Sequence, residues 1–418
     1  MAGLLQDIEL FGQDIPLLED IRKKGRNAFV LPTVKNEAWR YTKLHALKAD
    51  DFEILPRDLE IKDSTKEGCQ CRINCALDLP FETHQLHFYN GKFVPVHPVL
   101  PSGIKVMTLL EALVTGAFLE KSVDFAEHPF AALNAAYLEE GLFICVKKNT
   151  ILEKPLMIVN HTDCGGQNIL CNTRNVIMLE EGAKVELLEY YRYSGEPKSR
   201  YFNNIVNEIY LNPAAELNHY KFQNEAFKAV HIALNLVHVK GGGFYKSFCL
   251  QKGADLGRNE TKVLLEEENA KAEIDAAYVM NGWATLDIET NVEHLSPRTH
   301  SSQLVKGVVG GEARGVFQGK IHIAKHAVET TGYQLHKAML LSDTAEIDVK
   351  PELRIYADNV KCSHGAACGE LDKEQLFYMR SRGISKEEAE KILIDAYLQE
   401  AINRIDNPFI KEWMAAHV

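Results

Sequence analysis

The stretch LEEGAKVELLEYY at 179–191 leads from the end of one apolar run, through a short turn with Gly and Ala, into a run of alternating residues. Alternation with a period of two is typical of β-strands whose two faces meet different surroundings. Similar units recur as LNPAAELNHYKF at 211–222, VKGGGFYKSFCL at 239–250, EEENAKAEIDAAY at 266–278, VGGEARGVFQGKI at 309–321 and LSDTAEIDVKPEL at 341–353. The sequence therefore predicts more than two hundred residues of strands and tight turns.

The spacing of the small turn residues indicates a solenoid. They recur at a period of about 30 residues, with one longer gap, at Ala183, Ala215, Gly243, Ala270, Ala313 and Ala345. A single coil cannot bury its inner face, so coils of this length stack into one long core. We predict a mainly β fold, an irregular parallel β-helix. A twisted β-sandwich is the alternative, because the repeat is degenerate.

Helical patterns are confined to the two ends of the chain. We predict a mostly helical N-terminal region at 1–141, a β-helix core at 142–369 and a helical region at 370–418. In the last region, Asp372 and Ser385 have the sequence signature of helix N-caps. The second of these helices has a wide apolar face, which suits packing on the body plus contact with a partner; burial within its own domain is the alternative.

Composition narrows the class of protein. The 418 residues carry a net charge of -11 without a dense basic run, which argues against a nucleic-acid partner. No apolar run approaches the ~18 residues of a membrane span, and the N-terminus lacks the pattern of a signal peptide. Nine cysteines, an odd number, fit a reducing compartment, so we expect a cytoplasmic protein.

The segment CSHGAACGE at 362–370 holds the residues most suited to chemistry. If 354–364 is the last strand, Cys362 and His364 point to the same side, as a pair suited to iron, zinc or an iron–sulfur cluster. One chain then supplies too few ligands, so the site needs distant loops or another subunit. A buried thiol with a hydrogen-bonded histidine is the alternative. A nucleophilic Cys368 is disfavoured, because no cysteine-protease signature surrounds it.

Two other segments carry residues of interest. CQCRINC at 69–75 has closely spaced cysteines, Cys69, Cys71 and Cys75, but no second pair, so a half-buried strand is the favoured interpretation over a metal site. NEAWRYTKL at 36–44 places Trp39 and Tyr41 near basic residues, and we expect these aromatic side chains to anchor a loop to the body.

A longer run identifies a family. TTGYQLHKAMLLSDTAEIDVKPELRIYADNVKCSHGAACGELDKEQLFYMRSRGI at 330–384 closely resembles the C-terminal signature of the SufB/SufD family of iron–sulfur cluster assembly proteins, and NEAWRYTKL resembles its N-terminal motif. The motif CSHG resembles the SufD branch, because SufB-like chains carry Glu in place of Ser363 and Gly365. Cys368 departs from the family pattern, which often has an apolar residue there. The fold implied by the resemblance is a right-handed parallel β-helix between helical ends.

The resemblance implies a non-catalytic scaffold subunit. It would pair with a SufB-like paralogue through the β-helix, build a nascent iron–sulfur cluster at the shared interface, and bind a SufC-like ABC ATPase that hydrolyses ATP. His364 and Cys362 would be the metal ligands. The expected ATPase-binding residues are Leu376, Phe377, Met379, Arg380, Leu393 and Tyr397.

Several functional alternatives stay open at this stage. The chain could be a paralogue that only stabilises SufB and binds no metal, or a β-helix enzyme acting on polysaccharides, although no carboxylate pair stands out. In isolation it could form a homodimer through the surface meant for SufB. The sequence does not decide whether a flavin binds the complex.

Overall fold

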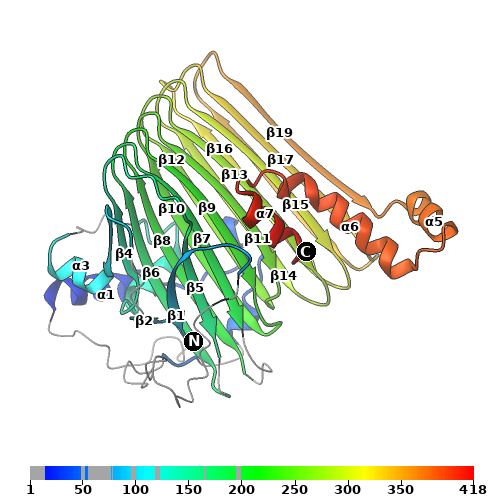
Figure 1. Ribbon diagram of the computed structural model, residues 1–418, viewed down its shortest axis with the longest axis horizontal. Coiled ribbons are helices and arrows are strands. Elements are labelled where there is room, and N and C mark those ends of the chain that lie inside the picture. Colours follow the sequence, from blue (N-terminus) through cyan, green and yellow to red (C-terminus); the bar gives the residue numbers. More distant parts are fainter. Residues whose placement is uncertain are drawn as a thin grey trace.

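The body of the protein is a parallel β-solenoid of about eight turns with helices at both ends of the chain (Figure 1). The computed structural model describes residues 15–48, 52–54, 77, 79–95, 100–117, 123–163, 166–193 and 199–418. The predicted mainly β solenoid fold is confirmed. Whether the three predicted regions behave as separate domains stays a prediction.

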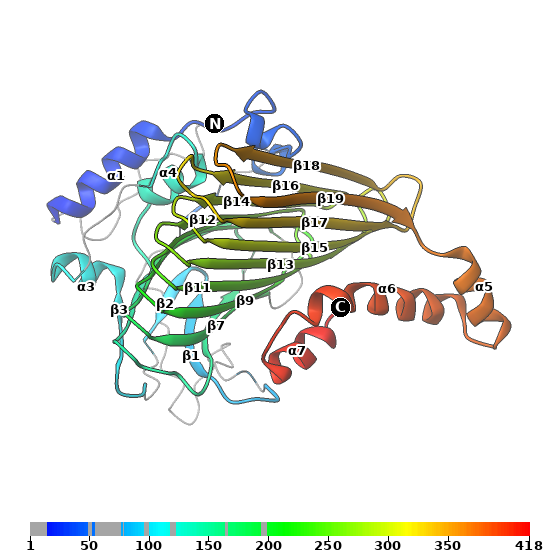
Figure 2. The same ribbon diagram turned by 90° about the horizontal axis from the view of Figure 1, so that it is seen from above.

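Two sheets form opposite walls of the solenoid (Figure 2). A ten-stranded sheet holds β1 (His84–Tyr89), β2 (Lys92–Val94), β5 (Leu156–Thr162), β7 (Lys184–Tyr193), β9 (Glu216–Asn224), β11 (Phe244–Lys252), β13 (Lys271–Met280), β15 (His300–Val309), β17 (Thr331–Leu340) and β19 (Lys361–Glu370). A nine-stranded sheet holds β3 (Ile104–Thr108), β4 (Leu142–Val146), β6 (Ile169–Leu179), β8 (Tyr201–Leu211), β10 (Ala229–Val239), β12 (Leu256–Leu265), β14 (Thr285–His294), β16 (Arg314–Ile323) and β18 (Glu346–Ile355). The chain alternates between the sheets, so each coil contributes one strand to each wall.

The turns explain the longer gap in the predicted series of small residues. Ala183, Ala215, Gly243 and Ala270 lie in turns from the nine-stranded to the ten-stranded sheet, each just after a residue with positive φ, such as Gly182 at 68°. Ala313 and Ala345 lie in turns at the opposite edge. The series therefore passes from one edge of the solenoid to the other between Ala270 and Ala313, which accounts for the longer gap. The coil period itself is unaffected.

Apolar side chains fill the first coils of the solenoid. A continuous core joins Leu142 and Ile144 of β4 to Leu156 and Ile158 of β5 and continues through later coils. Strands β1 and β3 precede residue 142 and extend the two sheets beyond this first coil. The N-terminal region thus contributes strands as well as helices.

The helices lie outside the two walls, and some of them cover the outer faces of the sheets. They are α1 (Pro16–Ala28), the 3₁₀ helix η2 (Glu37–Trp39), α2 (His45–Lys48), α3 (Leu109–Val114), α4 (Pro129–Ala136), α5 (Lys373–Ser381), α6 (Lys386–Ile402) and α7 (Pro408–Ala415). Helix α4 lies on the nine-stranded sheet, while α6 and α7 pack on the ten-stranded sheet. The N-caps predicted at Asp372 and Ser385 are confirmed. None of the described helices is long and apolar enough to cross a membrane.

The aromatic anchor predicted in the N-terminal region is confirmed for Trp39. Trp39 is 2% exposed, and its ring lies 4.1 Å from the guanidinium carbon of Arg258 on the outer face of the nine-stranded sheet. The hydroxyl of Thr42 donates to Asp287 of the same sheet at 2.5 Å. Cation–π contact and a buried hydrogen bond therefore hold this segment on the solenoid.

Candidate functional site

Strands β18 and β19 form the last coil of the solenoid (Figure 2). The expected single strand at 354–364 is wrong, because a turn with Asn359 at positive φ separates the two strands. Cys362 and His364 nevertheless share a face, since both lie in β19. They pair in register with Gly332 and Gln334, whose positions in β17 are buried. Both side chains therefore belong to the inner face of the solenoid, at its C-terminal end.

The extended backbone limits which donors can act together. Residues two apart on a strand lie about 7 Å apart, so the Cys362 and His364 side chains can converge on one ion. Cys368 is six residues from Cys362 in the same strand, which places it about 20 Å away and excludes it from that ion. Among the described residues, no group of three or more His, Cys, Asp and Glu side chains could hold a metal ion. The described part of the chain therefore brings two donors together here, where a tetrahedral site needs four.

Burial disfavours the thiolate form of both cysteines of β19. Partial burial raises the pKa of the Cys362 thiol, opposed by a hydrogen bond to the Gly332 backbone, and burial likewise raises the pKa of Cys368. A thiolate, which is the reactive and metal-binding form, then needs a metal or a nearby cation to displace the proton. The arrangement suits a ligand that is deprotonated on binding rather than a nucleophile.

The coil beneath carries two polar side chains that the sequence analysis did not single out. Gln334 and His336 lie on the inner face of β17 and are buried. The Nε2 atom of His336 lies 2.9 Å from the Tyr278 hydroxyl, and burial lowers the pKa of His336 to about 4, so its imidazole is neutral. The period of two that aligns Cys362 with His364 also aligns this pair. Extending that period by one coil would have found them.

The rim of the last coil is apolar. Ile347, Val349 and Leu353 of β18 are only partly buried, and Ile355 is 41% exposed. Tyr356, in the following turn, is 63% exposed. In the preceding coil, the register partners Phe317, Ile321 and Ile323 of β16 are all 0% exposed. This end therefore combines two potential metal ligands with apolar side chains that are only partly buried.

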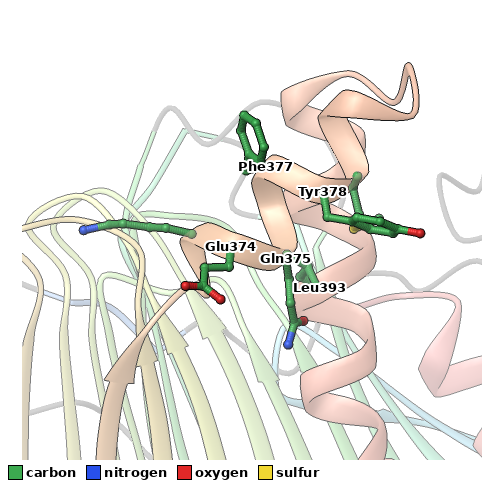
Figure 3. Close-up of a pocket in the computed structure, with 7 residues that line it drawn as sticks. Glu374, Gln375, Phe377, Tyr378 and Leu393 are labelled. Atoms are coloured by element: carbon green, nitrogen blue, oxygen red, sulfur yellow. The ribbon is translucent and has the colours of Figure 1, made fainter.

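A second exposed surface lies on the hairpin of α5 and α6, which extends away from the solenoid (Figure 1). A cleft of about 770 Å³ is lined by Lys373, Glu374, Gln375, Phe377, Tyr378, Met379 and Leu393. Figure 3 shows Phe377 and Tyr378 projecting from α5, with Leu393 on the adjoining helix. Phe377 is 74% exposed and Tyr378 59%. So large an exposed aromatic pair is typical of an interaction surface.

Family models match the segments that form the last coil and the hairpin of α5 and α6. The core-domain model of the SufBD proteins, described as SUF-system iron–sulfur cluster assembly, matches residues 162–397, and the SufBD N-terminal model matches residues 7–158. The chain belongs to the SufBD family. The predicted resemblance is confirmed, and the protein is a SufBD-family iron–sulfur cluster assembly protein.

Individual SufBD proteins match over most of their length. A SufBD family protein of Synechocystis is 31% identical, with 90% of this chain and 84% of the relative aligned. The iron–sulfur cluster assembly protein SufD of Escherichia coli is 29% identical over 93% of this chain and 88% of its own length. SufD of Bacillus subtilis is 26% identical over 73% of this chain and 69% of its own length.

The predicted partner-binding residues of this SufBD protein fall on two surfaces. Leu376, Phe377, Met379 and Arg380 lie on α5, with Phe377 and Arg380 exposed. Leu393 lines the cleft from the side of α6.

Tyr397 lies apart from the other predicted partner-binding residues. Its ring packs toward the ten-stranded sheet, with the Lys306 ammonium 3.9 Å from the ring centroid. The apolar stripe of α6, which consists of Ile394, Leu398 and Ile402, also packs there, as does Ile405 just after the helix. Cys69, Cys71 and Cys75 lie outside the described residues.

Proposed function

We propose that this chain is the SufD-type scaffold subunit of a cytoplasmic iron–sulfur cluster assembly complex. It pairs with a SufB-like paralogue at the last coil and binds a SufC-like ABC ATPase through the α5–α6 hairpin. The chain itself is not a catalyst, and ATP hydrolysis belongs to the ATPase. The nascent cluster, with its iron, is the cargo at the interface of the two paralogues.

The observation that carries the proposal is the uncovered last coil with Cys362 and His364 on its inner face. Two donors of one chain form half of a tetrahedral site, so a second chain that covers this end can supply the rest. The same contact buries the apolar side chains of β18, which supports association through the hydrophobic effect. Without the paralogue, a second copy of the chain covers the same end as a homodimer.

The hairpin supports a separate partner. Its cleft holds Phe377, Tyr378 and Leu393, whereas the apolar stripe that packs α6 on the body begins at the next residue, Ile394. A partner bound there can move without disturbing the solenoid core, as an ATPase that changes shape during its cycle requires. Exposed aromatic side chains are typical anchors of such contacts.

A purely architectural role is the second candidate. It is favoured by the small number of donors in this chain, since no three described ligand side chains come together. In that case the chain would stabilise the SufB-like paralogue, and the paralogue alone would bind iron. Family membership argues against the third idea, an enzyme acting on polysaccharides.

Co-expression with SufB-like and SufC-like partners separates the two candidates. We expect the His364→Ala complex to assemble normally but to contain several-fold less iron and acid-labile sulfide after anaerobic purification, because a ligand is lost. Cys362→Ser should lower the iron content as well. Equal iron in the wild-type and His364→Ala complexes would leave this chain as an architectural subunit.

The same preparation tests the hairpin. Phe377→Ala should weaken retention of the ATPase by about tenfold, as expected for loss of an aromatic anchor. Phe409→Ala on α7, where Phe409 is 58% exposed, is the matched control and should retain the ATPase fully. Retention that is unchanged in Phe377→Ala would assign ATPase binding to another surface.

A further inference from the structure

Two glutamines stand in line with His364 inside the solenoid. On successive strands of the ten-stranded sheet, Gln303 pairs in register with Gln334, and Gln334 pairs with His364; the position before Gln303 is the apolar Ile274. All of these positions lie on the inner face. Gln303 and Gln334 are each 3% exposed, whereas His364 lies in the open last coil. Gln334 is thus the buried neighbour directly beneath the candidate ligand.

The side-chain amide of Gln334 has no hydrogen-bond partner among the described residues, at either its nitrogen or its oxygen. It crosses the interior toward Gly319 of β16, where an added Cβ atom would lie 1.3 Å from Nε2 of Gln334. The Gln334 amide therefore occupies space that is free only because residue 319 is a glycine without a side chain. A buried amide left unpaired costs about 1 to 3 kcal/mol, so its position calls for a partner.

The coil above offers one polar partner at this point. Gly319 is in register with Pro351, whose ring can neither donate nor accept, and His336 is in register with Ala366. His364 stands directly over Gln334. Neighbouring strands lie about 4.8 Å apart, so rotation of the exposed imidazole brings a ring nitrogen within reach of the amide.

We propose that Gln334 is a positioning residue for His364, an inference that rests on the proposed function. The carbonyl oxygen of Gln334 accepts a hydrogen bond from one imidazole N–H. This fixes the tautomer and leaves the lone pair of the other ring nitrogen facing the interface, where iron is bound. Histidine ligands in proteins are commonly held in this way by a second group.

The test compares Gln334→Leu with Gln303→Leu, which removes a buried glutamine from the same column one coil deeper. The first readout is the tautomer of His364, observed by nitrogen NMR of the iron-free full-length chain labelled at histidine and assigned with His364→Asn. We expect one dominant tautomer in the wild type and in Gln303→Leu, and a mixture in Gln334→Leu. Gln334→Glu, which keeps an acceptor, should restore the single tautomer.

The second readout is iron per assembled complex, which should fall about tenfold in Gln334→Leu and stay unchanged in Gln303→Leu. Thermal midpoints of all variants show whether the chain still folds; if Gln334→Leu does not, Gln334→Ala, which also removes the acceptor, takes its place. Identical tautomer populations in the wild type and Gln334→Leu would overturn the inference even if iron falls. Normal iron in His364→Ala would instead overturn the proposed function, so the two failures are distinguishable.

Discussion

The two ends of the solenoid are built from the same kind of coil but are covered differently. At the N-terminal end, β1 adds a further strand to the ten-stranded sheet, and its Leu86 and Phe88 are each 1% exposed in the core that contains Ile158. At the C-terminal end, no described strand follows β18 and β19 in their sheets. Ile355 there remains 41% exposed.

The difference between the two ends lies in how the inner face of the terminal coil is buried. A coil cannot bury its own inner face, so each one depends on its neighbour. The closed end satisfies this need within the chain. At the open end no described strand satisfies it, and this is the end that carries Cys362 and His364. Incomplete burial and potential metal ligands therefore coincide.

Matched isoleucine substitutions should give the largest contrast between the ends. Ile158→Ala removes a side chain with 0% exposure and should destabilise the chain by about 3 kcal/mol, through lost burial and a residual cavity. Ile355→Ala should cost less than about 1 kcal/mol in the isolated chain, because its side chain already meets solvent. Urea unfolding followed by circular dichroism checks both values.

Equal losses in these two variants would mean that the open end is already covered in the isolated chain. Repeating the measurement at several protein concentrations then shows whether a second copy provides that cover. A homodimer makes the unfolding midpoint rise with concentration, whereas a monomer does not.

A charge at the open end should sharpen the contrast. Ile355→Asp leaves the isolated chain nearly as stable as the wild type but should weaken pairing with the SufB-like paralogue by at least about 30-fold, since a buried unpaired carboxylate is costly at an interface. Affinity is measured by titrating the purified partner. Val34→Asp, at a residue 54% exposed in the N-terminal region, is the control. Tight pairing by Ile355→Asp would place the interface elsewhere.

The sequence predicted the strands and turns of each coil, but not the edge of the solenoid at which each turn lies. Alternation in 179–191 and its relatives is a local signal, so strands and turns follow from it directly. The small residues of the turns look alike at both edges, so Ala270 and Ala313 belong to one series in the sequence although they lie at opposite edges. Local patterns do not record which edge a turn occupies.

In the candidate site, too, the sequence predicted only what neighbouring residues of one strand determine. Cys362 and His364 share a face because they are two residues apart in one strand, wherever that strand begins. The part played by Gln334 depends on its pairing with His364, which is thirty residues away in sequence and adjacent only through the stacking of coils. Similarly, the sequence does not distinguish Tyr397 from its neighbours on α6, because the contact between its ring and the Lys306 ammonium joins residues far apart in the chain.

The side of the solenoid offers a further comparison with its ends, with the smallest expected effect. Asp275 of β13 lies on the outer face under the C-terminal helices, where its Oδ1 accepts a hydrogen bond from the Leu304 backbone at 2.9 Å. Burial raises its pKa from 3.8 to about 7, although Arg404 and Lys246 act in the opposite direction. The folded chain thus holds the Asp275 proton more tightly than the unfolded chain does.

Between pH 4 and pH 7 the unfolded chain therefore binds fewer protons at Asp275 than the folded chain, so this residue lowers stability as pH rises through that range and contributes no further change above it. Asp275→Asn keeps the acceptor for Leu304 but cannot ionise, so its thermal midpoint should match the wild type near pH 4 and exceed it by about 2 °C at pH 8. The exposed Asp343→Asn is the control and should show no such divergence. Parallel curves for Asp275→Asn and the wild type would mean that water reaches this carboxylate, and that the helices cover the side of the solenoid less tightly than β1 covers its closed end.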